Sequence, residues 1–204
     1  MEHINHIELI GCPVCAPSYS HSNHGRQFYR FELEVTRLSG THDRLPVLAP
    51  LELLEGCPIE EGECLCVSGQ IRSFNNRFGS GSKLVISVLA ESLCPSCSEH
   101  NNQVHLQGVI CKEPIYRRTP LGREICDIML AVNRVYHRAD YLPCILWGRC
   151  AQDASVLPVG TGLQVCGRLQ SRDYIKLLDG IPQQRTAYEI SAITAMPFSD
   201  TEPS

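Results

Sequence analysis

The 204-residue chain is long enough for one large or two small domains, and its 43% hydrophobic and 20% charged residues are typical of a globular protein. A formal net charge of −4 excludes a protein that is basic throughout, but residues 1–101 carry 7 Lys/Arg and 12 Asp/Glu, whereas residues 102–204 carry 11 and 10. If one half binds a polyanion, we therefore expect it to be the second.

The sequence predicts a cytoplasmic protein. No apolar run reaches the roughly 18 residues that suggest a membrane span. The N-terminal stretch Met1-Glu2-His3-Ile4-Asn5 lacks the basic and apolar regions of a signal peptide. In the cytoplasm, metal binding or simple burial explains the twelve cysteines better than disulfides do.

Apolar and polar side chains alternate in several segments of the first half, as they do in half-buried strands. Together with one short apolar run, these segments predict five strands, at residues 5–11, 27–37, 45–48, 63–73 and 83–89. The second half repeats the first. Asn102–Gly108 matches Asn5–Gly11 at an offset of 97, and Gly167 matches Gly69 at an offset of 98. Agreement at turn and core positions indicates a duplicated unit of about 90 residues.

Each unit also contains a short segment between its third and fourth strands, which is Cys150–Leu157 in the second unit and is long enough for roughly two helical turns. Five strands with a helix at this point are the order of the OB-fold, a partly open Greek-key barrel. Two β-sandwiches would need about seven strands each. We therefore predict an all-β protein of two tandem OB-fold barrels, with a diverged barrel at 1–98, a second barrel at 102–197 and a short tail at 198–204.

The stretch from Leu142 to Tyr174 carries the best candidate binding residues. Its first strand ends at Trp147, the only tryptophan of the chain, and its second strand alternates arginines with other residues. An aromatic ring for a base and a cation for a phosphate are what a single-stranded nucleic acid needs. The alternatives are that Trp147 packs inside the barrel and that the arginines are merely solvated.

These residues suggest a family. The second unit resembles the bacterial single-stranded DNA-binding protein family, including the related primosomal replication protein N, from Asn102 to about Met196. The resemblance rests on Asn102-x-Val104-x-Leu106-x-Gly108, Thr119-Pro120-Leu121-Gly122-Arg123, Leu130-Ala131-Val132-Asn133-Arg134, Pro143-Cys144-Ile145-Leu146-Trp147-Gly148-Arg149 and Gly167-Arg168-Leu169-Gln170-Ser171-Arg172-Asp173-Tyr174.

The resemblance implies sequence-tolerant binding of single-stranded DNA along a groove. Tyr141, Trp147 and Tyr174 fall where family members stack bases, and Arg134, Arg149 and Arg172 fall on commonly basic positions. Arg117, Arg118 and Arg168 join this set if the strands pair as predicted. In the first unit, Arg72 and Phe74 are the clearest counterparts, but Pro50 occupies the position of Trp147. The family's long linker and acidic tip are not found, so we do not expect partners to be recruited by that route.

Two Cys-Pro-x-Cys sequences, Cys12–Cys15 and Cys94–Cys97, predict a structural zinc site made by Cys12, Cys15, Cys94 and Cys97. Two such pairs can complete a tetrahedral four-thiolate site. The 78 intervening residues far exceed the usual spacing, so reduced, unrelated cysteine pairs and redox chemistry stay open as alternatives. DNA binding itself is expected to need no cofactor.

No nucleotide-binding loop, serine-hydrolase elbow or zinc-protease sequence is present, so we do not expect an enzyme. The sequence predicts a protein that binds single-stranded DNA in replication, recombination or repair, with replication or recombination proteins as possible partners. Because family members often present four OB-folds together, two tandem barrels predict a homodimer. The alternative is a replication-restart or loading module whose first barrel binds a protein partner instead of DNA.

Overall fold

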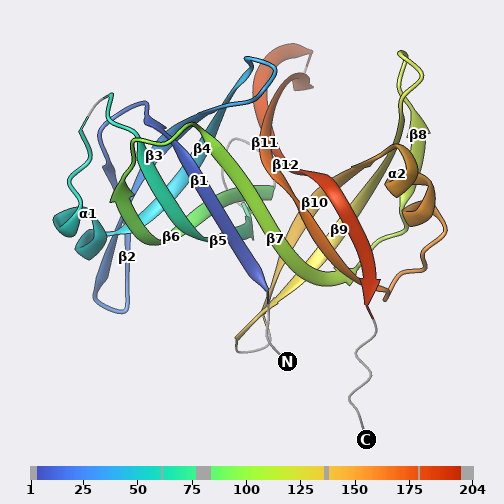
Figure 1. Ribbon diagram of the computed structural model, residues 1–204, viewed down its shortest axis with the longest axis horizontal. Helices are drawn as coiled ribbons and strands as arrows, with labels where there is room; N and C mark the ends of the chain where they lie inside the picture. Colours follow the sequence, from blue (N-terminus) through green and yellow to red (C-terminus); the bar gives the residue numbers. More distant parts are fainter. Residues whose placement is uncertain (1–3, 61, 77–83, 136–137, 179, 199–204) are drawn as a thin grey trace, which may run out of the picture. The chain divides into compact units, whose positions relative to one another are not determined.

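The computed structural model describes residues 4–60, 62–76, 84–135, 138–178 and 180–198, and Figure 1 shows it as a ribbon. The first half contains β1 (Asn5–Pro13), β2 (Ser18–Asn23), β3 (Arg26–Thr36), β4 (His42–Pro50), α1 (Leu51–Gly56), β5 (Leu65–Asn75) and β6 (Leu84–Pro95). The second contains β7 (Asn101–Ile110), β8 (Ile115–Arg118), β9 (Glu124–Arg134), β10 (Arg138–Trp147), α2 (Gly148–Ser155), β11 (Gly162–Leu178) and β12 (Ile181–Phe198). The predicted all-β class and the short helix in each half are confirmed.

Each half forms its own barrel. In the first, neighbouring strands follow the order β2-β3-β4-β6-β5-β1, and β1 also pairs with β3, which closes the barrel. In the second, the corresponding order is β8-β9-β10-β12-β11-β7, and β7 also pairs with β9. The core of each barrel consists of the inward-facing aliphatic side chains of these strands, such as Leu33 and Val67 in the first and Leu130 and Val165 in the second.

The duplication extends to the pairing of individual residues. Ile7 lies opposite Gly69 in the first barrel, and Val104 lies opposite Gly167 in the second. A buried ion pair is also repeated. Arg37 Nε donates to Asp43 Oδ2 over 2.7 Å, and Arg134 makes the equivalent two-pronged contact with Asp140. Both aspartates are almost completely buried, so each needs this partner to offset the loss of water.

Two strands were not predicted. β2 and β8 are short and exposed along their whole length, and among the described residues each pairs only with the long strand that follows it. Strands exposed on both faces carry no alternating apolar pattern, so the sequence offered no signal for them.

The chain divides into two compact units. One comprises His6–Gln103 together with Asp173–Ala187, and the other contains Val104–Arg172 and the strand residues from Tyr188 onwards. The predicted boundaries differ from this division at Asp173–Ala187, which we had placed in the second domain. Among the described residues, no helix is both long and apolar enough to cross a membrane.

Candidate nucleic-acid interface

The outer face of β10 exposes two aromatic side chains. Along this strand the even-numbered residues from Asp140 to Leu146 point into the barrel, so Tyr141 and Trp147 both point outwards. Their exposed fractions are 46% and 39%. The packed position that we weighed for Trp147 does not occur, because the inward positions of the strand are filled by aliphatic side chains.

The end of β10 holds the tryptophan in place. Trp147 is the last residue of the strand, and α2 begins at the next residue, Gly148. The φ of Gly148 is 54°, a conformation that favours glycine. The indole Nε1 donates a hydrogen bond to Ser191 Oγ on β12 over 3.1 Å. This hydrogen bond at the edge of the indole fixes the orientation of the ring, while part of the ring surface remains open to solvent.

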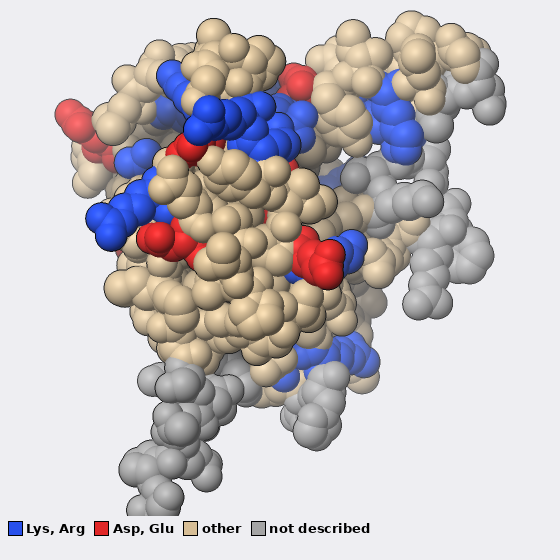
Figure 2. All heavy atoms as spheres, turned by 90° about the vertical axis from the view of Figure 1, so that its right-hand side faces the viewer, with Lys and Arg blue, Asp and Glu red and all other residues tan. Residues whose placement is uncertain are grey.

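Two arginines on strands to either side of β10 are paired with carboxylates. Arg117 Nε lies 2.7 Å from Asp127 Oδ2, and Arg172 Nε lies 3.5 Å from Glu189 Oε1. The hydrogen bond that Arg117 donates to Asp127 raises the pKa of Arg117, and the negative charge of Glu189 contributes to the same shift. Figure 2 shows how closely basic and acidic side chains alternate on the side of the molecule that carries β8 and α2.

The register places these pairs on the same outer face as the aromatics. Asp127 lies opposite Ile145 of β10, and Glu189 is two residues before the Ser191 that holds Trp147. Arg168 is exposed on β11, four residues before Arg172 and on the same side of the strand. We name the set Tyr141, Trp147, Arg117, Arg168 and Arg172 the outer-face cluster.

The other predicted arginines of the second barrel lie elsewhere. Arg134 pairs with the buried Asp140, so it has a structural role, and its predicted part in DNA binding stays a prediction. Arg149 is on α2, where its side chain is 92% exposed and forms a loose ion pair with Asp153. Arg118 lies on the opposite side of β8 from Arg117 and pairs with Glu124.

Glu124 joins three elements on that opposite side. It accepts hydrogen bonds from Tyr116 and Arg118 of β8 and from Gln152 of α2, and these contacts, with that of Tyr116 the strongest, lower its pKa. The predicted contribution of Arg118 to DNA binding stays a prediction, but its contact with Glu124 has a clear structural role.

Comparisons with known proteins identify the family of the chain. The model of the single-strand binding protein family matches residues 101–197, which is the second barrel. Single-stranded DNA-binding protein B of Bacillus subtilis is 36% identical over 80 residues, and the match covers 71% of that protein and 36% of this chain. The chain belongs to the single-strand binding protein family.

Other family members match over a smaller share of their length. Single-stranded DNA-binding protein 2 of Listeria innocua is 36% identical and single-stranded DNA-binding protein A of Bacillus subtilis is 39% identical, each over 80 residues and 36% of this chain. The matches cover 50% and 46% of those proteins, so the chain spans about half the length of these relatives.

Solved structures extend the likeness to both barrels. A deletion mutant of the single-stranded DNA binding protein from Thermus aquaticus superposes with a TM-score of 0.76 at 25% identity, covering 98% of this chain and 97% of the other. The wild-type Thermus protein gives a TM-score of 0.80 at 24% identity over similar shares, which supports the shared fold. The tandem OB-fold prediction is therefore confirmed.

Three predicted residues of this family member fall outside the compact unit that holds the outer-face cluster. Tyr174 belongs to Asp173–Ala187, where it is half-buried and lines a shallow surface hollow with Pro182 and Gln184. Phe74 is 57% exposed near the end of β5, and Arg72 is half-buried on the same strand. Their roles in binding stay predictions.

The β2–β3 hairpin carries aromatic residues that sequence reasoning missed. Tyr19 and Tyr29 contact edge to face with ring centres 5.8 Å apart, and His21 stacks on Phe28 at 5.1 Å. Arg26 lies over the Phe28 ring. The adjacent Phe28 and Tyr29 were visible in the sequence, but without the unpredicted strand β2 their partners could not be identified.

A cysteine–histidine cluster lies in the first barrel, but its composition differs from the predicted zinc site. Cys12, Cys64 and His100 bring their ligand atoms within 4.8 Å of one another. Of the predicted set, Cys12 belongs to this cluster, whereas Cys15 and Cys97 are exposed and Cys94 lies opposite Cys66 on the β5–β6 ladder. The hydrogen bond with Cys64 raises the pKa of Cys12 to about 11. The sequence signal that we overlooked was His100, three residues after Cys97.

Proposed function

We propose that the protein binds single-stranded DNA with little sequence preference, through the outer-face cluster of the second barrel. The observation that carries this proposal is the exposure of Tyr141 and Trp147 on the outer face of β10, with Arg117 on β8 and Arg172 on β11, two strands away on either side. The named relatives are single-stranded DNA-binding proteins, and the family model covers the barrel that carries this face.

In this mechanism, bases stack on Trp147 and Tyr141 while the arginines contact the phosphates. Every base has a flat face, so stacking tolerates any sequence and contributes about 1–3 kcal/mol per base. Arg117 and Arg172 are more than half exposed, and exposed ion pairs contribute only about 0–1 kcal/mol. Phosphate oxygens can therefore replace Asp127, whose side chain is 34% exposed, at little cost. Glu189 is only 16% exposed, so the loss of Arg172 as its partner costs more.

The proposed activity requires no cofactor and no catalytic group. It places the protein in the bacterial cytoplasm, where exposed single strands arise during replication, recombination and repair and where proteins of these processes are its possible partners. We also propose a homodimer, since two chains would supply four OB-folds to one DNA strand.

A second candidate function concerns the first barrel. Pro50, at the position equivalent to Trp147, is buried at the end of β4, and residues 1–101 carry an excess of five acidic groups. These two features favour a barrel that binds a protein partner, as in a loading or replication-restart module, while the second barrel holds DNA.

The main proposal is tested by titrating the full chain with fluorescently labelled oligo-dT and following anisotropy. We expect Trp147→Ala to weaken binding by about 1–3 kcal/mol, the contribution of one stacked base. Trp147→Phe retains a ring and should lose less. Ser191→Ala removes only the hydrogen bond to the indole, so it controls for the orientation of the ring. Wild-type affinity in Trp147→Ala would exclude Trp147 from the interface.

A further inference from the structure

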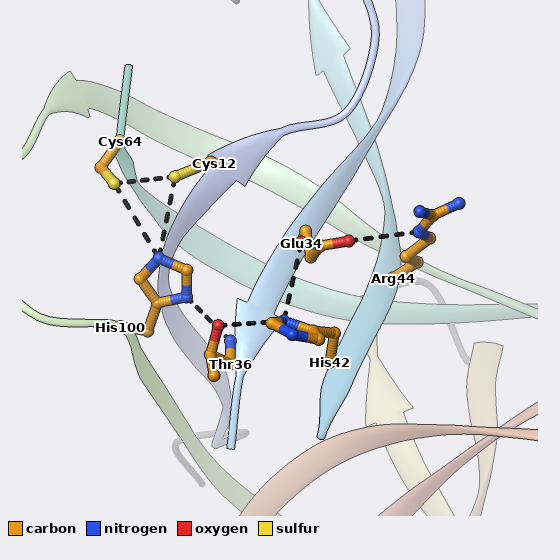
Figure 3. Close-up of polar contacts among 7 residues, drawn as sticks. All are labelled: Cys12, Glu34, Thr36, His42, Arg44, Cys64 and His100. Carbon is orange, nitrogen blue, oxygen red and sulfur yellow. Dashed lines mark hydrogen bonds and ion pairs between the residues drawn. The ribbon is translucent and has the colours of Figure 1, made fainter. Parts of the chain in front are cut away.

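Three possible ligand side chains from separate segments of the first barrel meet beside β1 (Figure 3). Cys12 is on β1, Cys64 directly precedes β5 and His100 directly precedes β7. The two sulfur atoms are 2.9 Å apart, and His100 Nε2 lies 3.7 and 4.0 Å from them. We propose that these three residues bind a thiophilic divalent cation, with Zn²⁺ as the expected ion, at a structural site.

The distances need only a small adjustment to fit a tetrahedral ion. Zinc–sulfur bonds of about 2.3 Å and zinc–nitrogen bonds of about 2.0–2.1 Å place neighbouring ligand atoms about 3.4–3.8 Å apart. The two distances from His100 to the sulfurs are already close to this range. The sulfurs of Cys12 and Cys64 would have to separate by roughly 1 Å, as the cation takes the place of the hydrogen between them.

The hydrogen bonds of His100 define what the cation must displace. The backbone N–H of Thr36 donates to His100 Nδ1 over 2.8 Å, so the proton of the neutral ring is on Nε2 and points towards the sulfurs. A cation can bind Nε2 only without this proton. On binding, the ring proton therefore moves to Nδ1, the Thr36 hydrogen bond breaks, and the two thiols release their protons to solvent.

Cys97 is the best-placed fourth ligand. It precedes His100 with two residues between them, a spacing that allows both to bind one ion, and it is exposed. The backbone N–H of Ser96 donates to the Cys64 carbonyl over 2.8 Å, so the neighbour of Cys97 is already tied to the site. By contrast, Val14, the residue before Cys15, donates a backbone hydrogen bond to the carbonyl of Glu32 on β3.

Such an ion would connect three segments that are far apart in the sequence. It would fasten residues 96–100 to the first barrel in addition to the hydrogen bond of Ser96, and it would replace the Thr36–His100 hydrogen bond as the second point of attachment. Since the unfolded chain does not hold these ligands together, binding energy would appear as stability of the first barrel.

The test uses the reduced full-length chain, freed of metal with a chelator and titrated with Co²⁺ and Zn²⁺. We expect one cation per chain, and a thiolate-to-cobalt charge-transfer band with the visible bands of a tetrahedral site. Zinc at about 100 times its Kd should raise the Tm of the first barrel by about 10 °C. Cys12→Ser, Cys64→Ser and His100→Gln should each weaken zinc binding at least about tenfold, and Cys97→Ser should also weaken it.

Cys166→Ser is the matched control, because Cys166 also lies beside a histidine, with its sulfur 3.3 Å from His105 Nδ1, but in the second barrel. This variant should keep wild-type affinity. Nitrogen NMR of the wild type should show His100 changing from the Nε2–H to the Nδ1–H form as zinc is added, which supports the site even if a variant fails to fold.

Three results would overturn the proposal. The first is reduced wild-type protein that binds no Co²⁺ or Zn²⁺. The second is His100→Gln with unchanged affinity, because thiols alone would then hold the ion. The third is a Cys12–Cys64 disulfide in protein purified anaerobically without reductant.

Discussion

At the scale of single residues, two carboxylates offset two of the three arginines of the outer-face cluster, although the cluster is proposed to bind a polyanion. Asp127 and Glu189 each hold one of its arginines, so a DNA strand has to compete with groups that are already present. The chain's net charge of −4 also gives no general attraction to DNA. Affinity must therefore come largely from stacking, and the local carboxylates limit the share that phosphates contribute.

This balance predicts that removing a carboxylate strengthens binding. In Asp127→Asn, Arg117 loses its anionic partner and becomes available to a phosphate. We expect affinity for oligo-dT to rise by up to about fivefold, the range of an exposed ion pair. We also expect the slope of log K against log salt to steepen by about 0.7, the value for one additional phosphate contact on a single strand. Titrations at several salt concentrations measure both quantities.

The control for this variant is Glu55→Gln, which makes the same change of charge on an exposed residue of α1 in the first barrel. It should leave the salt slope unchanged. A weaker affinity for Asp127→Asn, or an equal gain in the control, would mean that local pairing with Arg117 does not limit binding.

At the scale of elements, glycines allow the strands that close each barrel to approach closely. A Cβ atom on Gly11 of β1 would lie 2.3 Å from the carbonyl oxygen of Glu34 on β3. At the equivalent Gly108 of β7, the distance to the Ala131 carbonyl oxygen would be 2.5 Å. The neighbour is backbone in both cases, so a side chain cannot be accommodated by a change of rotamer.

Gly11→Ala should therefore destabilise the first barrel by about 1–3 kcal/mol, the usual cost of overpacking, seen as a lower denaturation midpoint. Gly56→Ala is the matched control at the end of α1, where an added Cβ meets nothing within 4 Å and φ is not positive. That substitution should be neutral or slightly stabilising. Equal losses in both variants would mean that the strand crossing tolerates a methyl group.

The same crossings show why the fold was predictable from sequence. The repeated glycines, the alternating core residues and the Arg37–Asp43 pair recur at a nearly constant offset, and all are dictated by the path of the backbone. β2 and β8 lacked any such pattern because they bury neither face. The third strand of the first half, predicted at 45–48, runs from His42 to Pro50, and the outward residues at its start, His42 and Arg44, are polar.

The candidate site was less predictable than the fold. The family resemblance pointed to Tyr141 and Trp147, and the structure shows that both side chains lie on the outer face of β10. However, the buried partner of Arg134 lies six residues away across a hairpin, so its structural role was not apparent. The cluster of Cys12, Cys64 and His100 was not predicted, because its members are brought together by the barrel and not by their spacing in the sequence, and the four-cysteine site stays a prediction.

At the scale of the whole molecule, the open question is whether both barrels hold one strand of DNA. One OB-fold covers about 4–16 nucleotides, so an oligo-dT of about 10 nucleotides occupies one barrel and one of about 40 can reach both. If both bind, the second contact becomes intramolecular and affinity rises steeply with length. Phe74, exposed on β5, is the residue of the first barrel through which to test this.

We expect Phe74→Ala to leave binding of the short oligonucleotide unchanged and to weaken binding of the long one, by about 1–3 kcal/mol if one stacked base is lost. Trp147→Ala should weaken both. Leu38→Ala, at a residue of the first barrel that is 97% exposed, controls for general loss of apolar surface. If Phe74→Ala matches Leu38→Ala at both lengths, Phe74 makes no stacking contact, and the first barrel becomes the better candidate for a protein partner.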